Sequence, residues 1–218
     1  MERPGPRVLS WPHRVILAEG WARRGLAFLA GACGALALEP VDFLPAMAAS
    51  LILAVWLLDG CADNRAGRGF AAKTASLRMA AGVGWWWGFG YFLAGLWWLG
   101  TAMLVEPDQF AWALPLATLG MPAALALFPA LGFALARLLW SPGALRVLAL
   151  AVGLGGAEWL RGHVLTGFPW NDVGMALATA PALAQSASRI GLHGLDLAAI
   201  VILAAPATLI DEPDRGWR

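Results

Sequence analysis

Long apolar stretches, separated by short groups of charged residues, make up most of this 218-residue sequence. Six apolar runs can be read between the charged positions, at about residues 26–38, 43–58, 79–105, 110–136, 145–160 and 190–210. A helix needs roughly 20 apolar residues to cross a bilayer, and the third, fourth and sixth runs reach that length. The pattern therefore predicts an all-α protein, a polytopic transmembrane helix bundle with about six spans.

Composition supports this prediction and excludes several other classes of protein. Hydrophobic residues make up 60% of the chain and charged residues 13%, whereas soluble domains carry about 25% charged residues. The formal net charge of +1 provides no field that would attract a nucleic acid. The two cysteines have neither the spacing of a metal site nor that of a disulfide framework. We therefore expect no cofactor and no metal.

The short first run has a second interpretation. With Arg23 and Arg24 before it and small residues near its end, it also imitates a secretory signal peptide. The distribution of basic residues argues against cleavage. With six spans and a cytoplasmic amino terminus, 13 Lys and Arg residues fall inside and only Arg161 and Arg189 fall outside. This asymmetry follows the positive-inside rule, and removing one span would destroy it.

The same asymmetry sets the expected domain organisation. Residues 1–24 form a cytoplasmic amino-terminal tail, 25–210 a transmembrane helical domain and 211–218 a cytoplasmic carboxyl-terminal tail. The outer loops are expected at about 39–42, 105–109 and 161–189. Most of the 13 tryptophans fall at span ends, as interfacial rings do, and only Trp97 and Trp98 are expected deeper. Prolines at 115, 122 and 129 predict a bent fourth span.

No side chain stands out as a catalytic nucleophile. Cys33 lies within an apolar run without a charged neighbour, and Cys61 follows Asp59 and precedes Asp63, two acids that would raise its pKa. Lys73 is the only lysine and is expected in a cytoplasmic loop. The common motifs of soluble hydrolases and nucleotide-binding enzymes are absent from the sequence.

Polar residues instead gather toward the outer side, at Glu158 and Arg161, then His163, then Asn171 and Asp172. Glu158 and Arg161, three residues apart, share a helix face and can pair there. Arg189, His193 and Asp196 follow at spacings of four and three, which also predicts a common face. Ionisable residues inside spans are candidates for function, but mutual pairing explains both groups without a ligand. Both interpretations remain open at this stage.

A turn just after the fifth run presents two aromatic side chains. Gly167 and Pro169 favour a tight turn that exposes Phe168 and Trp170 at the outer membrane surface. The pair could contact acyl chains or headgroups of a bound lipid, or it could be an ordinary interfacial anchor.

The segment EWLRGHVLTGFPWN at 158–171 resembles the apolipoprotein N-acyltransferase family. Three further segments match in the family's order, GACGALALEP at 31–40, GWWWGFGYFLAGLWW at 84–98 and SRIGLHGLDL at 188–197. The resemblance implies an enzyme of the bacterial inner membrane. Such an enzyme moves an acyl chain from a phospholipid to the amine of the diacylglyceryl-cysteine that begins an apolipoprotein, the last step of lipoprotein maturation.

The family places a nitrilase-like domain with a Glu-Lys-Cys triad after the membrane helices, and no residue here can carry that triad. The resemblance therefore implies the membrane part of such an enzyme, truncated or encoded separately from its catalytic domain and inactive alone. Its implied partners are a phospholipid donor, an apolipoprotein acceptor and a nitrilase-like domain. The substrate-binding candidates are Trp170, Phe168, Arg161 and Glu158, with no catalytic residue. A transporter or channel subunit and a structural membrane protein are the alternatives.

Overall fold

The computed structural model describes residues 11–61, 69–164 and 167–211, and within these segments every regular element is a helix. The α-helices are α1 (Trp11–Ile16), α2 (Gly20–Ala35), α3 (Leu44–Asp59), α4 (Phe70–Gly95), α5 (Leu99–Ala102), α6 (Pro107–Phe110), α7 (Met121–Leu125), α8 (Leu127–Leu138), α9 (Leu145–His163), α10 (Met175–Ala178), α11 (Pro181–Ala184) and α12 (Ala187–Ala204). Short segments of other helix types occur at η1 (Ala111–Ala113), η2 (Leu116–Gly120) and η3 (Ala205–Ile210). The all-α prediction is confirmed.

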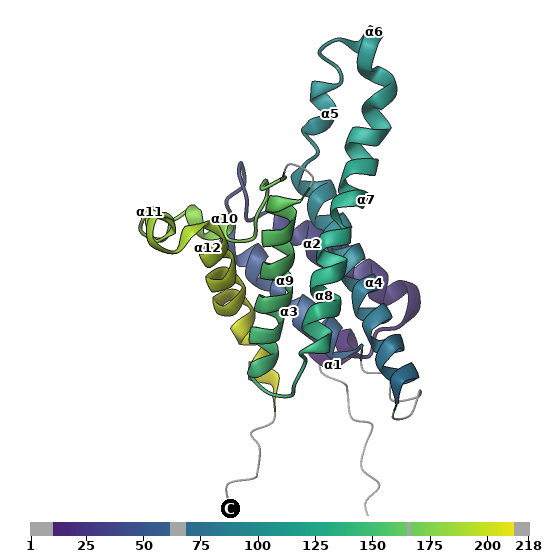
Figure 1. Cartoon of the computed structure of the whole chain (residues 1–218), viewed down its shortest axis with the longest axis vertical. Helices are drawn as coiled ribbons and strands as arrows, with labels where there is room; N and C mark the ends of the chain where they lie inside the picture. Colours follow the sequence, from purple (N-terminus) through teal and green to yellow (C-terminus); the bar gives the residue numbers. More distant parts are fainter. Residues whose placement is uncertain (1–10, 62–68, 165–166, 212–218) are drawn as a thin grey trace, which may run out of the picture.

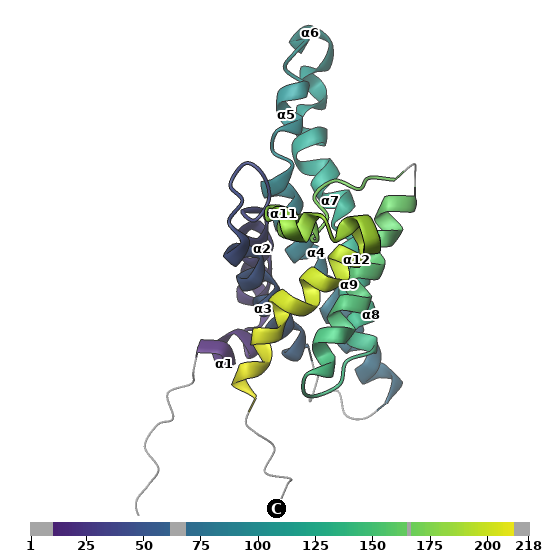
Figure 2. The ribbon, with the colours of Figure 1, turned by 90° about the vertical axis from the view of Figure 1, so that its left-hand side faces the viewer.

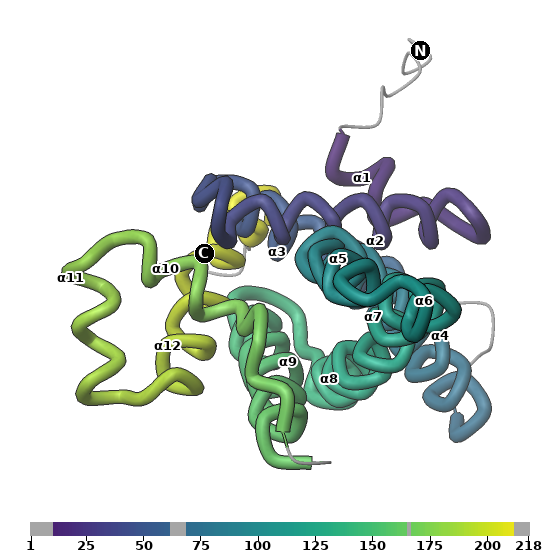
Figure 3. Tube along the Cα trace, turned by 90° about the horizontal axis from the view of Figure 1, so that it is seen from above, coloured from purple at the N-terminus to yellow at the C-terminus, as the bar shows by residue number. Residues whose placement is uncertain are grey.

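The long helices form one bundle, and a helical arm made of α5, α6, η1 and η2 extends beyond one end of it (Figure 1), while α7 packs against α4. Helix α1 and the end of α12 lie at the opposite end (Figure 2). Seen along the bundle, α4 lies between α2 and α8, α9 packs beside α8, and α12 contacts both α9 and α3 (Figure 3). We call the end that carries the arm the outer end and the other the inner end.

Within the described part of the chain, two helical segments are long and apolar enough to cross a membrane, Pro107–Leu138 and Ala187–Ile210. They correspond to the fourth and sixth apolar runs. Helix α3 is also apolar but is shorter, at 16 residues. The six-span topology stays a prediction, as do the tails, whose residues 1–10 and 212–218 lie outside the described part of the chain.

The third apolar run is not one continuous helix, and this changes the position of two tryptophans. Helix α4 starts at Phe70 and ends at Gly95, so its 26 residues already extend about 39 Å at 1.5 Å per residue. Trp97 and Trp98 follow this end, and their exposed fractions are 62% and 38%. Both tryptophans therefore lie beyond the end of α4, and their depth in the membrane stays a prediction.

The proline-rich fourth run is bent, as predicted. Between Pro115 and Pro122 the backbone adopts a π-helical turn, η2, and α7 and α8 continue the path from there. A proline removes one hydrogen-bond donor and displaces the preceding turn, which accounts for the change of helix type. The bend separates the arm from the part of this segment that packs in the bundle.

Glycines let neighbouring helices touch at the level of the backbone. A Cβ atom added at Gly31 of α2 would lie 1.8 Å from the carbonyl oxygen of Trp87 on α4. Added Cβ atoms would also meet backbone carbonyls at Gly90 against Phe28, Gly84 against Pro129 and Gly153 against Gly132. Close contact between small residues is a main source of helix association where lipid replaces water. These contacts fix the pairs α2 with α4, α4 with α8, and α8 with α9.

Candidate functional site

Arg161 is the centre of a buried polar cluster at the outer end of α9. The residue is 1% exposed, and its Nη2 group donates to carboxylate oxygens of both Glu158 and Asp172. The predicted pairing of Glu158 with Arg161 is thus confirmed. Because both acids are also almost fully buried, these interactions are shielded from solvent.

The second half of the guanidinium holds the loop that follows α9. Nη1 donates to the carbonyl oxygens of Phe168 and Trp170, the latter at 2.7 Å. The Phe168 amide in turn donates to the Arg161 carbonyl at 3.0 Å. An irregular loop has backbone groups without helical partners, and here one arginine satisfies two of them. Arg161 therefore sets the position of the GFPW segment.

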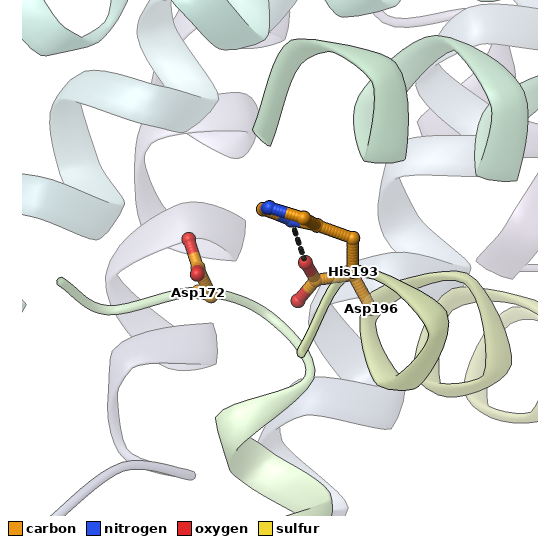
Figure 4. A group of neighbouring side chains, drawn as sticks. All are labelled: Asp172, His193 and Asp196. Carbon is orange, nitrogen blue, oxygen red and sulfur yellow. Dashed lines mark hydrogen bonds and ion pairs between the residues drawn. The ribbon is translucent and has the colours of Figure 1, made fainter. Parts of the chain in front are cut away.

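Helix α12 fixes the far end of the same loop. Asp196 is fully buried, and one of its carboxylate oxygens accepts the Gly174 amide at 2.7 Å. The other oxygen lies 3.4 Å from Nδ1 of His193, whose side chain is 37% exposed. Figure 4 shows His193 and Asp196 on one helix with Asp172 facing them from the loop.

The predicted group of Arg189, His193 and Asp196 is only partly correct. Gly191, between Arg189 and His193, has a φ of 72° and a ψ of 176°, which interrupts the helical path. A residue four positions before His193 therefore does not share its face. Arg189 is exposed, and within the described residues it has no ion pair with Asp196.

The aromatic side chains of the loop extend to a third tryptophan. The ring centroids of Phe168 and Trp170 lie 5.2 Å apart, and Trp170 packs at 5.1 Å against Trp98, which follows α4. Trp170 is 47% exposed, whereas Phe168 is half-buried against the core. The predicted aromatic pair exists, and Trp98 extends it into a cluster of three rings, the outer aromatic cluster.

A pocket of about 470 Å³ opens beside the outer aromatic cluster. It lies between the turn joining α2 to α3, the end of α4, the loop and α10. Its lining residues are Leu38, Glu39, Asp42, Gly95, Trp98, Asn171, Met175, Ala178 and Thr179. This volume is in the range of small-ligand pockets. The outer end therefore has both an exposed aromatic cluster and a pocket beside it.

Burial controls the ionisation of two groups outside the helices of the bundle. Burial raises the pKa of Asp172, although Arg161 opposes this shift. Burial also raises the pKa of the Cys61 thiol to about 11. The predicted direction for Cys61 is confirmed, and Asp59 does raise this pKa, but desolvation by burial is the largest cause. Asp63 lies outside the described residues.

The structure brings all four predicted binding residues, Trp170, Phe168, Arg161 and Glu158, to one place. The predicted binding set did not include Asp172 and Trp98, which touch Arg161 and Trp170 respectively. Asp172 was already among the polar residues predicted to gather at the outer side, and the structure adds its contact with Arg161. Trp98 gave no such signal, because its contact with Trp170 depends on where α4 ends.

A helical bundle with two apolar segments long enough to cross a membrane and a buried ionic cluster is typical of membrane-associated proteins, and comparison with known sequences identifies the family. The sequence model described as Apolipoprotein N-acyltransferase N-terminal domain matches residues 30–205. The chain belongs to this family.

Individual relatives agree with this assignment. The chain is 55% identical over 197 residues to an apolipoprotein N-acyltransferase of Rhodopseudomonas palustris, an alignment that covers 90% of this chain and 35% of the relative. Identity is 53% over 196 residues with the enzyme of Brucella suis and 50% over 196 residues with that of Agrobacterium fabrum, with 90% and 36% covered in each case. The chain thus spans about a third of the length of the curated relatives that it matches.

Proposed function

We propose that this chain is the membrane part of a phospholipid:apolipoprotein N-acyltransferase. In this role it presents a phospholipid acyl donor and the diacylglyceryl-cysteine amine of an apolipoprotein to a nitrilase-like catalytic domain. Support comes from the family membership and from the pocket and aromatic cluster at the outer end.

The proposed setting is the bacterial inner membrane, crossed six times with both tails in the cytoplasm. The crossings correspond to α2, α3, α4, the bent segment Pro107–Leu138, α9 and α12 with η3. The 13-to-2 distribution of Lys and Arg supports this orientation. Cysteine-accessibility labelling tests it, and a periplasmic location of the loop that contains Lys73 would contradict it.

The hydrogen bonds from Arg161 to the carbonyls of Phe168 and Trp170 are the observation that carries the site assignment. They hold the aromatic side chains beside the pocket, where a lipid chain or headgroup could lie against the rings. Arg161 and Glu158 are buried, so we assign them a positioning role through this loop, while Phe168 and Trp170 form the contact surface.

Acyl transfer to a lipopeptide in detergent micelles tests this proposal, with the chain joined to a nitrilase-like domain of the family. Trp170→Ala should lower turnover by about tenfold or more, equivalent to at least 1.4 kcal/mol of lost positioning. Trp112→Ala is the matched control, because Trp112 is 77% exposed on the arm and belongs to another segment. Unchanged turnover in Trp170→Ala at normal abundance would leave only the interfacial-anchor interpretation.

Neither cysteine of the chain is prepared for nucleophilic attack. Cys61 is buried with a pKa of about 11, so only about one thiol in a thousand is ionised at pH 8. Cys33 is half-buried, and its Sγ lies 3.8 Å from the Ala46 carbonyl oxygen. We expect Cys33→Ala and Cys61→Ala to leave turnover of the joined enzyme unchanged. A thioester on this chain that either substitution abolishes would contradict the proposal.

A further inference from the structure

The polar cluster at the outer end contains more buried negative charge than positive charge. Glu158, Asp172 and Asp196 are each at most 1% exposed, and Arg161 is the only buried cation among the described residues at this end. Arg161 offsets one of these acids, and two carboxylates then remain. Burying an uncompensated charge costs several kcal/mol, so these acids require either protons or another cation.

Asp172, His193 and Asp196 are arranged so that a single ion could contact all three. One ligand atom from each lies within 4.8 Å of the other two. Figure 4 shows the three side chains converging from the loop and from α12. Asp172 provides an independent indication, because its Oδ2 atom is buried and has no hydrogen-bond partner in the structure. Its Oδ1 atom is already used by Arg161.

From this geometry we infer that Asp172, His193 and Asp196 form a binding site for one divalent transition-metal ion of the zinc class. One imidazole and two carboxylates are a ligand set that Zn²⁺ accepts, whereas Ca²⁺ and Mg²⁺ prefer oxygen alone. The +2 charge of the ion balances the two carboxylates that Arg161 leaves over. The ion would link the loop to α12 at a second point besides the hydrogen bond from Gly174 to Asp196.

Binding requires the three ligand atoms to move closer together. Ligand atoms about 2.1 Å from a tetrahedral ion lie about 3.4 Å apart, so a pair at the observed limit of 4.8 Å must approach by about 1.4 Å. His193 can contribute to this approach, because its side chain is 37% exposed and its Nδ1 already lies 3.4 Å from Asp196. The same exposure gives an ion access from the outer surface. This site does not depend on the acyltransferase proposal, since metal binding is measured without any substrate.

The test uses the purified 218-residue chain in detergent, with an affinity tag that contains no histidine. Titration with Zn²⁺ after chelator treatment should give about one ion per chain, and Co²⁺ should produce the visible absorption of a nitrogen- and oxygen-ligated ion. His193→Ala should weaken Zn²⁺ binding by about tenfold to a hundredfold. Asp196→Asn should also weaken it, while Ca²⁺ at equal concentration should not displace Zn²⁺.

His163→Ala is the matched control, because the ring of His163 lies 5.7 Å from that of His193 but is not part of the group of three. It should bind Zn²⁺ as the unmodified chain does. Helical content by circular dichroism shows that each variant is folded, which matters most for Asp196→Asn because that acid is buried. A folded chain that takes up no stoichiometric Zn²⁺, or His193→Ala with unchanged affinity, would overturn the inference and leave protons as the balancing charge.

Discussion

The two ends of α9 each carry a buried arginine, but the acidic partners of the two residues differ in their exposure to solvent. At the inner end Arg146, which is 6% exposed, lies 2.8 Å from Asp211 and 3.6 Å from Asp59. Its partners are 35% and 19% exposed. At the outer end Arg161 has two acidic partners whose side chains are only 1% exposed. The inner arginine therefore lies at a boundary with solvent, and the outer one is enclosed by protein.

The two arginines also contact different kinds of structure. Arg146 connects the end of α3 with the end of η3, two regular elements that already pack against the core. Arg161 holds the carbonyl groups of a loop that has little regular structure of its own. The comparison teaches that a buried charged side chain contributes most to structure where backbone carbonyl and amide groups lack hydrogen-bond partners in a regular element. Irregular loops of this kind often carry binding surfaces.

Removing the outer arginine should have the largest effect. Arg161→Ala leaves Glu158 and Asp172 buried without their cation, so we expect a loss of about 3–5 kcal/mol in unfolding free energy. SDS-induced unfolding followed by circular dichroism measures this loss. Arg161→Lys should recover only part of it, because lysine cannot reach two carbonyls and two carboxylates in one plane. Arg189→Ala is the control, and an equal loss there would contradict the assignment.

Removing the inner arginine should cost less. Arg146→Ala leaves two acids that water can reach, so we expect a loss of about 1–2 kcal/mol. Because Asp211 is the more exposed partner, part of the interaction should weaken with added salt. The comparison between the two ends would fail if Arg146→Ala proved as destabilising as Arg161→Ala under the same conditions.

The smallest expected effect concerns a neutral donor at the inner end. The Trp140 indole Nε1 donates to Asp59 at 3.0 Å, and Trp140→Phe removes this bond while keeping an aromatic ring. We expect a loss of about 1 kcal/mol, the usual value of one hydrogen bond. Combining it with Arg146→Ala should give less than the sum, because both residues contact Asp59. Strict additivity would show that the inner contacts are independent.

The sequence predicted the helical class, the bend in the fourth run and the pair of Glu158 with Arg161, because each depends on local spacing. The third apolar run, at residues 79–105, did not predict where α4 begins and ends. That helix begins in a polar stretch at Phe70 and includes Lys73 and Arg78, so hydrophobicity and helix extent differ there. The position of Trp98 could not be derived without this boundary.

The candidate site was predicted in part for a similar reason. Glu158 and Arg161 are three residues apart on a regular helix, whereas Asp172 and Asp196 reach the cluster through a loop and a separate helix. The sequence spacing of Arg189 and His193 predicted a shared face, but the left-handed backbone of Gly191 breaks that periodicity. The expectation of no metal rested on spacing alone, and the group of Asp172, His193 and Asp196 that we propose as a metal site combines residues up to 24 positions apart.

The backbone contacts at the glycines also decide where a lipid cannot pass. A single added carbon at Gly31, Gly84 or Gly153 would already overlap the neighbouring helix, so an acyl chain has no room to thread between α2 and α4, α4 and α8, or α8 and α9 at those levels. These three helix pairs are therefore closed to a lipid at the levels of the glycines. Under the proposed function, a lipid that reaches the pocket from the bilayer would enter away from these contacts, beside the arm or along α12.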